Sequence, residues 1–217
     1  MIRAAIFDMD GLLFDTERLC CEAWRTVASA SGLTMDDGLF FSCVGRNNRD
    51  TREIVTAAMG SGFPYEQFVL QSREWMKERM TVNGPPEKAG IRPLFDFLQD
   101  RGVLLGLATS TSEASARWMI ERAGLTGRFS AMAFGSEVER GKPEPDIFLL
   151  ALGRLGRFEP ADCAVFEDSP AGIRAAHAAG MKPVLVPDLV IPEPAVRGLA
   201  WKVTDRLDRA ADDGFWL

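Results

Sequence analysis

The sequence AAIFDMDG, residues 4–11, decides how the rest of the chain is interpreted. Its four apolar residues are typical of a short buried strand, and the acids Asp8 and Asp10 follow directly. A second apolar run ends in the same way, in the sequence AVFED at residues 164–168. Parallel strands of an open α/β sheet collect their carboxyl ends in one crevice, where ligands bind. The two acidic pairs are therefore predicted to be neighbours, although they lie far apart in the sequence.

Such a group of acids indicates a metal site. Carboxylates crowded together repel one another unless a cation lies among them. Mg²⁺ prefers oxygen ligands and suits a site of this composition. The sequence therefore predicts an acidic site at the sheet edge, with Mg²⁺ as its cofactor.

Composition limits the classes of partner. The chain has 217 residues, of which 47% are hydrophobic, and a formal net charge of -6. This length suffices for one sizeable core or for a core with a small second domain. The negative charge and the lack of a basic stripe argue against nucleic acid as a partner. No obligate protein partner is evident from the sequence.

Targeting signals and disulfides are not expected. Residues 1–4 lead directly into a strand without a signal-type apolar region, and no stretch approaches the roughly 18 apolar residues of a membrane span. The four cysteines lack metal-binding spacing such as CxxC, so reduced thiols are expected. The sequence predicts a cytoplasmic protein that does not bind membranes.

The spacing of apolar residues changes along the chain. About seventy residues after the first strand have little strand character, and helical spacing predicts helices over 17–30 and 65–80. After the sequence GPP at residues 84–86, strands alternate with helices, as in a parallel sheet with crossover helices. The predicted strands are 103–108, 131–134, 164–166 and 183–186, and the predicted helices are 93–100, 113–123, 146–155 and 171–179.

This pattern predicts an α/β fold with a small helical insertion. Residues 1–14 and 84–217 are expected to form a Rossmann-like, three-layer core around a parallel sheet. Residues 15–83 are expected to form an all-helical cap domain, inserted after the first strand. An insertion at this point belongs at the carboxyl edge of the sheet, where a lid would lie.

Polar residues follow the later strands in a definite order. Thr109, Ser110 and Thr111 follow one strand, Lys142 comes after the next, and Glu167-Asp168 follows the third. Taken alone, a Ser/Thr cluster after a strand is usually a helix cap, and a lysine is usually solvated. The joint order of acids, hydroxyls, lysine and acids instead predicts a catalytic site.

A phosphate-binding P-loop is excluded. The sequence GSEVERGK, residues 135–142, has one residue too many for that motif, and Pro143 stands where the motif needs Ser or Thr. Nucleotide hydrolysis of the P-loop kind is therefore not expected.

Four motifs in register resemble those of the haloacid dehalogenase superfamily. They are DMDG at 8–11, TS at 109–110, GKPEPDIF at 141–148 and EDSPAGI at 167–173, and together they cover nearly the whole chain. The resemblance is to the subgroup with a small helical cap, which contains β-phosphoglucomutase and many sugar phosphatases. Any one motif is weak evidence, whereas four in order are specific.

The resemblance implies a role for each motif residue. Asp8 is then the nucleophile that forms an aspartyl phosphate, and Asp10 is the general acid and base. Thr109, Ser110 and Lys142 bind the phosphoryl group. Mg²⁺ is held by Asp8, Asp168 and the main-chain carbonyl of Asp10, with Glu167 in support.

A phosphatase is favoured over a mutase. In the mutase resemblance, a histidine in the cap assists the acid/base, and an arginine, a lysine and an asparagine hold the second phosphate of a bisphosphate. This chain has Cys20, Asn48, Ser112 and Glu113 at those positions. The cationic site for the second phosphate is therefore missing. The expected substrate is a small phosphorylated metabolite, a sugar or polyol phosphate. A mutase remains the alternative, since Arg46 or Arg49 would supply a cation in a shifted register.

Substrate specificity is expected to come from the cap and its hinge. The candidate contacts are Thr16, Glu17, Cys20, Arg46, Asn47, Asn48, Arg49 and Lys77. Non-enzymatic alternatives are a phospho-receiver and a phosphate-binding protein without activity. In the receiver resemblance the chain is shorter and the lysine comes after the acids and the hydroxyl, whereas here Lys142 precedes the second acidic pair.

Overall fold

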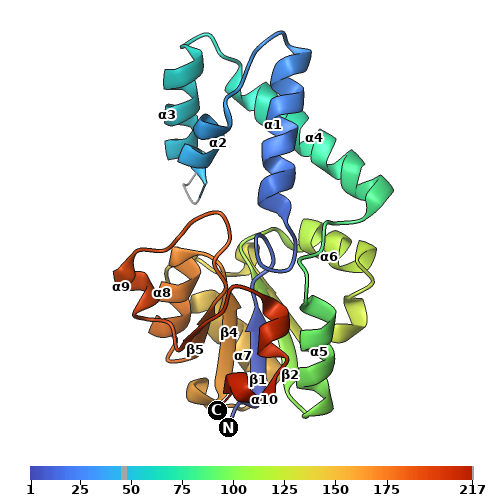
Figure 1. The fold of residues 1–217 in the computed structure, drawn as a ribbon, viewed down its shortest axis with the longest axis vertical. Helices are drawn as coiled ribbons and strands as arrows, with labels where there is room; N and C mark the ends of the chain where they lie inside the picture. The colour runs from blue at the N-terminus through green and yellow to red at the C-terminus, as the bar shows by residue number, and fades with distance from the viewer. Residues whose placement is uncertain (45–47, 217) are drawn as a thin grey trace. The chain divides into compact units, whose positions relative to one another are not determined.

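The structure is a computed structural model that describes residues 1–44 and 48–216, with backbone only for residues 48, 213 and 214. The chain forms two compact units (Figure 1). One unit combines Met1–Phe14 with Glu87–Leu217, and the other is Asp15–Pro86. Among the residues described, none of the helices has both the length and the apolar character that a membrane crossing requires.

The first unit is built on a parallel sheet. Six strands run in the order β3-β2-β1-β4-β5-β6, and each neighbouring pair is parallel. This order is that of the doubly wound nucleotide-binding folds. The strands are β1 Ala4–Phe7, β2 Leu104–Thr109, β3 Ala131–Phe134, β4 Cys163–Glu167, β5 Lys182–Leu185 and β6 Lys202–Val203.

Helices cover both faces of this sheet. One face, which includes Ile6 and Val165, packs against α7 and α8. On the other face, Phe95 of α5 lies edge-on to Phe7, and Trp216 of α10 lies edge-on to Phe166. The helices of this unit are α5 Ile91–Asp100, α6 Glu113–Arg122, α7 Asp146–Leu155, α8 Pro170–Ala178, α9 Pro194–Arg197 and α10 Asp213–Trp216. The predicted three-layer α/β architecture is confirmed.

Small differences from the predicted elements have physical reasons. Strand β2 extends to Thr109, one residue beyond the prediction, because Thr109 still pairs with Phe134 of β3. Strand β6 was not predicted, and its two residues are too few to give a periodic signal. These differences do not alter the order of the motifs along the sheet edge.

The second unit is entirely helical in its described part. Its helices are α1 Thr16–Ala30, α2 Asp37–Cys43, α3 Asn48–Met59 and α4 Tyr65–Asn83. Trp24 of α1 packs edge-on against Phe40 of α2 and Phe68 of α4, and so forms the centre of its core. The helices predicted over 17–30 and 65–80 are confirmed, whereas α2 and α3 were not predicted individually within the segment expected to be helical. That residues 15–83 act as a cap stays a prediction.

The two chain segments that link the units pair with each other. Phe14 and Glu87 form an antiparallel bridge, and the Asp15 amide donates to the Pro86 carbonyl at 2.8 Å. The Lys88 amide donates to the Leu13 carbonyl, also at 2.8 Å. The backbone of both linkers is therefore hydrogen-bonded rather than free.

The aromatic contact beneath β1 should be a major source of stability. Phe95 is fully buried, and its ring contacts Phe7 and Phe129. Phe95→Ala should lower the free energy of unfolding by about 3–5 kcal/mol, because it removes buried surface and leaves a cavity. Urea unfolding, followed by tryptophan fluorescence, measures the change. Leu149→Ala is the control, since Leu149 is 44% exposed on α7; equal losses in the two variants would show that Phe95 is not a core residue.

Candidate active site

The nucleophile candidate and the second acidic pair meet at the carboxyl edge of two adjacent strands. Phe7 of β1 lies in register with Phe166 of β4. One residue further, the Asp8 amide donates to the Phe166 carbonyl at 3.1 Å. The side chains of Asp8 and Glu167 are both buried at this edge. The register therefore brings together the acids that the sequence had placed 159 residues apart.

Lys142 lies between these two acids. Its ammonium group donates to Oδ1 of Asp8 and, at 2.6 Å, to Oε1 of Glu167. The ammonium also lies 4.9 Å from the centre of the Phe148 ring. In the turn that carries the lysine, Arg140 binds both carboxylate oxygens of Asp146, at 2.8 and 3.1 Å. The motif thus supplies both a cation and a turn that directs it inward.

The ionisable groups of this cluster shift one another's pKa. Burial raises the pKa of Asp8 to about 7, against the lowering effect of Lys142. Burial, together with the charges of Glu167 and Asp8, raises the pKa of Asp168 well above its usual range. For Lys142, burial disfavours the charge, but Asp8 and Glu167 outweigh it and raise the pKa. Lys142 therefore stays protonated, and its ammonium group contacts the carboxyl groups of Asp8 and Glu167.

Glu167 is held by the start of α8. Its Oε2 accepts hydrogen bonds from the amide and the hydroxyl of Ser169, both at 2.9 Å. The Ser169 hydroxyl in turn accepts from the Gly172 amide at 3.0 Å and so caps the helix. A Cβ at Gly172 would overlap the Glu167 carboxylate. Ser169 and Gly172 therefore fix the Glu167 carboxylate in place.

The described residues at this edge fit a divalent cation. Asp8, Glu167 and Asp168 each offer a carboxylate oxygen, and the three atoms lie within 4.8 Å of one another. Oδ1 of Asp168 is buried and accepts no hydrogen bond from the described residues. Gly11 has a φ of +80°, and a Cβ there would collide with Asp168. Hard oxygen donors with excess negative charge suit Mg²⁺.

The hydroxyl motif lies on the neighbouring strand. Thr109 is buried at the end of β2, and its Oγ1 accepts from the Thr111 amide at 3.0 Å. The Thr111 hydroxyl donates to Oδ2 of Asp10 at 2.7 Å. Ser110, which the sequence assigns to phosphate binding, is exposed. The contact of Thr111 with Asp10 was not predicted, because no local pattern reveals a bond between loops of two strands.

The other predicted substrate contacts belong to the helical unit or lie outside the described residues. Thr16 is the first residue of α1, in the helical unit, and is buried there. Arg46 and Asn47 lie outside the described residues, as does the side chain of Asn48. Their assignment to substrate binding stays a prediction.

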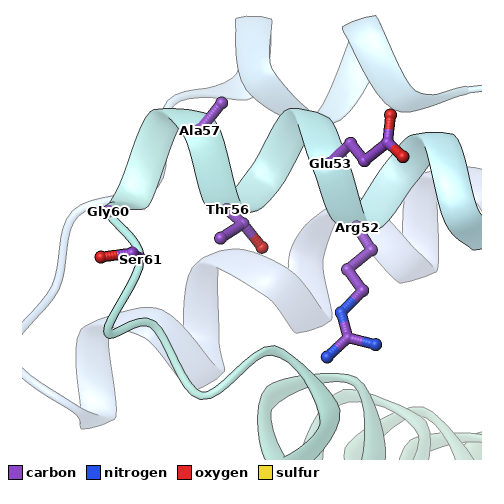
Figure 2. Close-up of a pocket in the computed structure, with 6 residues that line it drawn as sticks. All are labelled: Arg52, Glu53, Thr56, Ala57, Gly60 and Ser61. Atoms are coloured by element: carbon purple, nitrogen blue, oxygen red, sulfur yellow. The ribbon is translucent and has the colours of Figure 1, made fainter.

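The helical unit has a shallow hollow of its own, shown in Figure 2. Arg52, Glu53 and Thr56 of α3 contribute to it, together with Ala57, Gly60 and Ser61. The Arg52 guanidinium already pairs with Glu66 at 3.1 Å. Among the residues that the structure describes, none of those predicted for the catalytic site lines this hollow.

Comparison with known proteins agrees with this geometry. The family model described as haloacid dehalogenase-like hydrolase matches residues 2–180. The "Phosphorylated carbohydrates phosphatase" of Thermotoga maritima is 37% identical over 181 residues, which cover 83% of each chain. The "Beta-phosphoglucomutase" of Bacillus subtilis is 31% identical over 204 residues, covering 88% of this chain and 89% of the relative.

A solved structure extends the similarity to the whole fold. The crystal structure of CbbY from Rhodobacter sphaeroides in complex with phosphate matches with a TM-score of 0.79 and 26% identity, over 100% of each chain. The match to the family model spans the two acidic pairs, the hydroxyls and Lys142, which the sheet brings to one edge. On this evidence, the chain belongs to the haloacid dehalogenase-like hydrolases.

Proposed function

We propose that this protein is a Mg²⁺-dependent phosphatase of a small phosphorylated carbohydrate, a sugar or polyol phosphate. The observation that carries the proposal is the buried cluster in which Lys142 contacts both Asp8 and Glu167 beside the Asp168 carboxylate. A nucleophile, a cation for phosphoryl oxygens and a set of metal ligands are thereby combined in one place. Membership of a hydrolase family favours this enzyme over a phospho-receiver or an inactive binding protein.

The reaction proceeds in two steps that regenerate the enzyme. In the first, an Asp8 oxygen attacks phosphorus, the bond to the substrate oxygen breaks, and Asp10 gives its proton to the departing alkoxide. In the second, Asp10 takes a proton from water, which attacks the aspartyl phosphate and releases inorganic phosphate. Asp8 is then a carboxylate again, and Asp10 again carries its proton.

Positive charge makes the first step feasible. A carboxylate that approaches a phosphate dianion meets strong repulsion. In this proposal Lys142 and the Thr109 hydroxyl bind the phosphoryl oxygens, together with Ser110, which follows Thr109 in the sequence. Asp8, Asp168 and the Asp10 carbonyl, with Glu167 in support, would hold Mg²⁺, which would supply further positive charge against the phosphoryl oxygens.

The choice of a phosphatase over a mutase has support from this chain's own residues. Burial raises the pKa of the Cys20 thiol to about 12, so the thiol keeps its proton at neutral pH and cannot take the part of a histidine. The Ser112 hydroxyl contacts Ser115 at 3.1 Å, and Glu113 pairs with Arg117 at 2.8 Å.

Three expectations stay predictions. They are that the protein is cytoplasmic, that it has no macromolecular partner, and that its substrate contacts include Thr16, Arg46, Asn47 and Asn48.

Phosphate release tests the proposed function. The protein should release inorganic phosphate from one group within a panel of sugar, polyol and nucleoside monophosphates, and a chelator of Mg²⁺ should abolish release. The panel should include β-glucose 1-phosphate with a trace of its bisphosphate and detection of glucose 6-phosphate. Glucose 6-phosphate formed without release of phosphate would contradict the proposal and establish a mutase.

Asp8→Asn should abolish turnover, because an amide cannot serve as the attacking carboxylate. Release of phosphate measures turnover, and mass spectrometry of the acid-quenched protein detects the aspartyl phosphate. The variant removes a buried charge next to Lys142, so circular dichroism should first establish that it folds. A folded variant with most of the wild-type rate would rule out Asp8 as the nucleophile.

Asp10→Asn should slow turnover by roughly 10²- to 10⁴-fold, the usual contribution of a general acid/base. Its amide is similar in shape to the carboxyl group but cannot exchange the proton. Steady-state kinetics on the best substrate of the panel measures the loss. A rate near that of the wild type would mean that water or another group carries the proton.

A further inference from the structure

We propose that Thr111 is a positioning residue, which holds the Asp10 carboxyl group in place for both proton transfers. The inference rests on the proposed function, since it concerns the acid/base of that reaction. Its starting point is one hydrogen bond, in which the Thr111 hydroxyl donates to Oδ2 of Asp10 at 2.7 Å.

The bond joins two loops that the sheet brings side by side. Phe7 of β1 lies in register with Leu107 of β2. Asp10 follows Phe7 by three residues, and Thr111 follows Leu107 by four, so the two loops leave the same edge of adjacent strands. Asp10 and Thr111 are 101 residues apart in the sequence, so a local turn cannot account for their contact.

The backbone of Thr111 is itself fixed by the phosphate-binding motif. Its amide donates to Oγ1 of Thr109 at 3.0 Å. The Thr111 hydroxyl is therefore presented from a turn whose geometry depends on Thr109. One residue thus links the hydroxyl proposed to bind phosphate with the carboxyl group proposed to move the proton.

The backbone of Asp10 is fixed by a second turn. The Leu13 and Phe14 amides both donate to the Met9 carbonyl, at 2.9 and 3.1 Å, and the Gly11 amide donates to the Phe14 carbonyl at 2.9 Å. This turn sets the position of the Asp10 Cα. The orientation of its carboxyl group still depends on side-chain rotation, which the bond from Thr111 restricts.

A fixed carboxyl group matters because Asp10 acts twice. It must lie within hydrogen-bond reach of the leaving oxygen in the first step and of water in the second. As Asp10 gives up its proton in the first step, the Thr111 hydroxyl comes to donate to a developing carboxylate, and hydrogen bonds to charged groups are stronger than those between neutral groups. Losing the bond from Thr111 allows the carboxyl group to leave the productive position, and misplacement of a reacting group is costly in rate.

Thr111→Val tests the proposal, since valine keeps the shape of threonine without the hydroxyl. The probes are phenyl phosphate, whose leaving group benefits from a proton, and p-nitrophenyl phosphate, whose leaving group departs without one. Thr111→Val should lower kcat/KM for phenyl phosphate by on the order of 10- to 100-fold, the effect of losing a hydrogen bond to a charged group. It should affect p-nitrophenyl phosphate much less, because kcat/KM there reports phosphoryl transfer to Asp8 alone.

Three further variants make the test specific. Thr111→Ser keeps a hydroxyl and should recover most of the lost rate. Ser115→Ala removes an exposed hydroxyl four residues further along the chain and should leave both substrates unaffected. In an Asp10→Ala background, Thr111→Val should cause no further loss, because the group that it positions is gone.

The outcomes separate this inference from the proposed function. Equal losses on the two aryl phosphates, or an undiminished loss in the Asp10→Ala background, would overturn the positioning role of Thr111. If Asp10→Ala is slow but Thr111→Val keeps the wild-type rate, only the role of Thr111 is overturned. An Asp10→Ala variant with the wild-type rate on phenyl phosphate would instead overturn the acid/base role of Asp10. If Thr111→Val fails to fold, Thr111→Ser decides, since a loss on phenyl phosphate as large as that of Asp10→Ala contradicts the proposal.

Discussion

The Lys142 ammonium group, buried between the carboxylates of Asp8 and Glu167, is the contact on which the site depends. Removing one partner of a buried ion pair typically costs about 3–5 kcal/mol, since the other charge is left uncompensated. We therefore expect the folded state to need Lys142, apart from the role proposed for it in binding the phosphoryl group. Asp168 adds a third carboxyl group, so the edge of the sheet offers three oxygen donors within 4.8 Å of one another, a set that could hold a divalent cation.

Small residues around this cluster follow from its crowding. Side chains are excluded at Gly11 by Asp168 and at Gly172 by Glu167, so both positions require glycine. Ser169 meets two needs, because its hydroxyl caps α8 and also donates to Glu167. The motifs therefore combine groups that react with groups that only leave room or hold others in place. The acids and the lysine are easily recognised in the sequence, whereas Gly11, Gly172 and Ser169 leave room for the Asp168 and Glu167 side chains or hold them.

Much of the fold was predictable because its signals are local. A short apolar run ending in acids, followed later by alternating strands and helices, predicted the parallel sheet and the inserted helices. Helices α2 and α3 were not predicted individually within the segment 15–83 that was expected to be helical, and α2 has only seven residues. The same locality explains why Asp8, Asp10, Lys142, Glu167 and Asp168 could be selected as a set: each lies at or just after a strand end, or in a motif with a recognisable order.

The sequence by itself determined the class of fold, the family and the chemical groups available to the reaction. Tertiary structure decided which of those groups touch. The register of β1 against β4 sets Asp8 beside Glu167, and the register of β1 against β2 brings the Thr111 hydroxyl to Asp10. Propensity and spacing act over a few residues, and motif order does not say which side chains touch, whereas strand pairing joins residues a hundred or more positions apart. Contacts of that kind exist only once the sheet has formed, and for this reason the hydrogen bond from Thr111 to Asp10 became visible only in the structure.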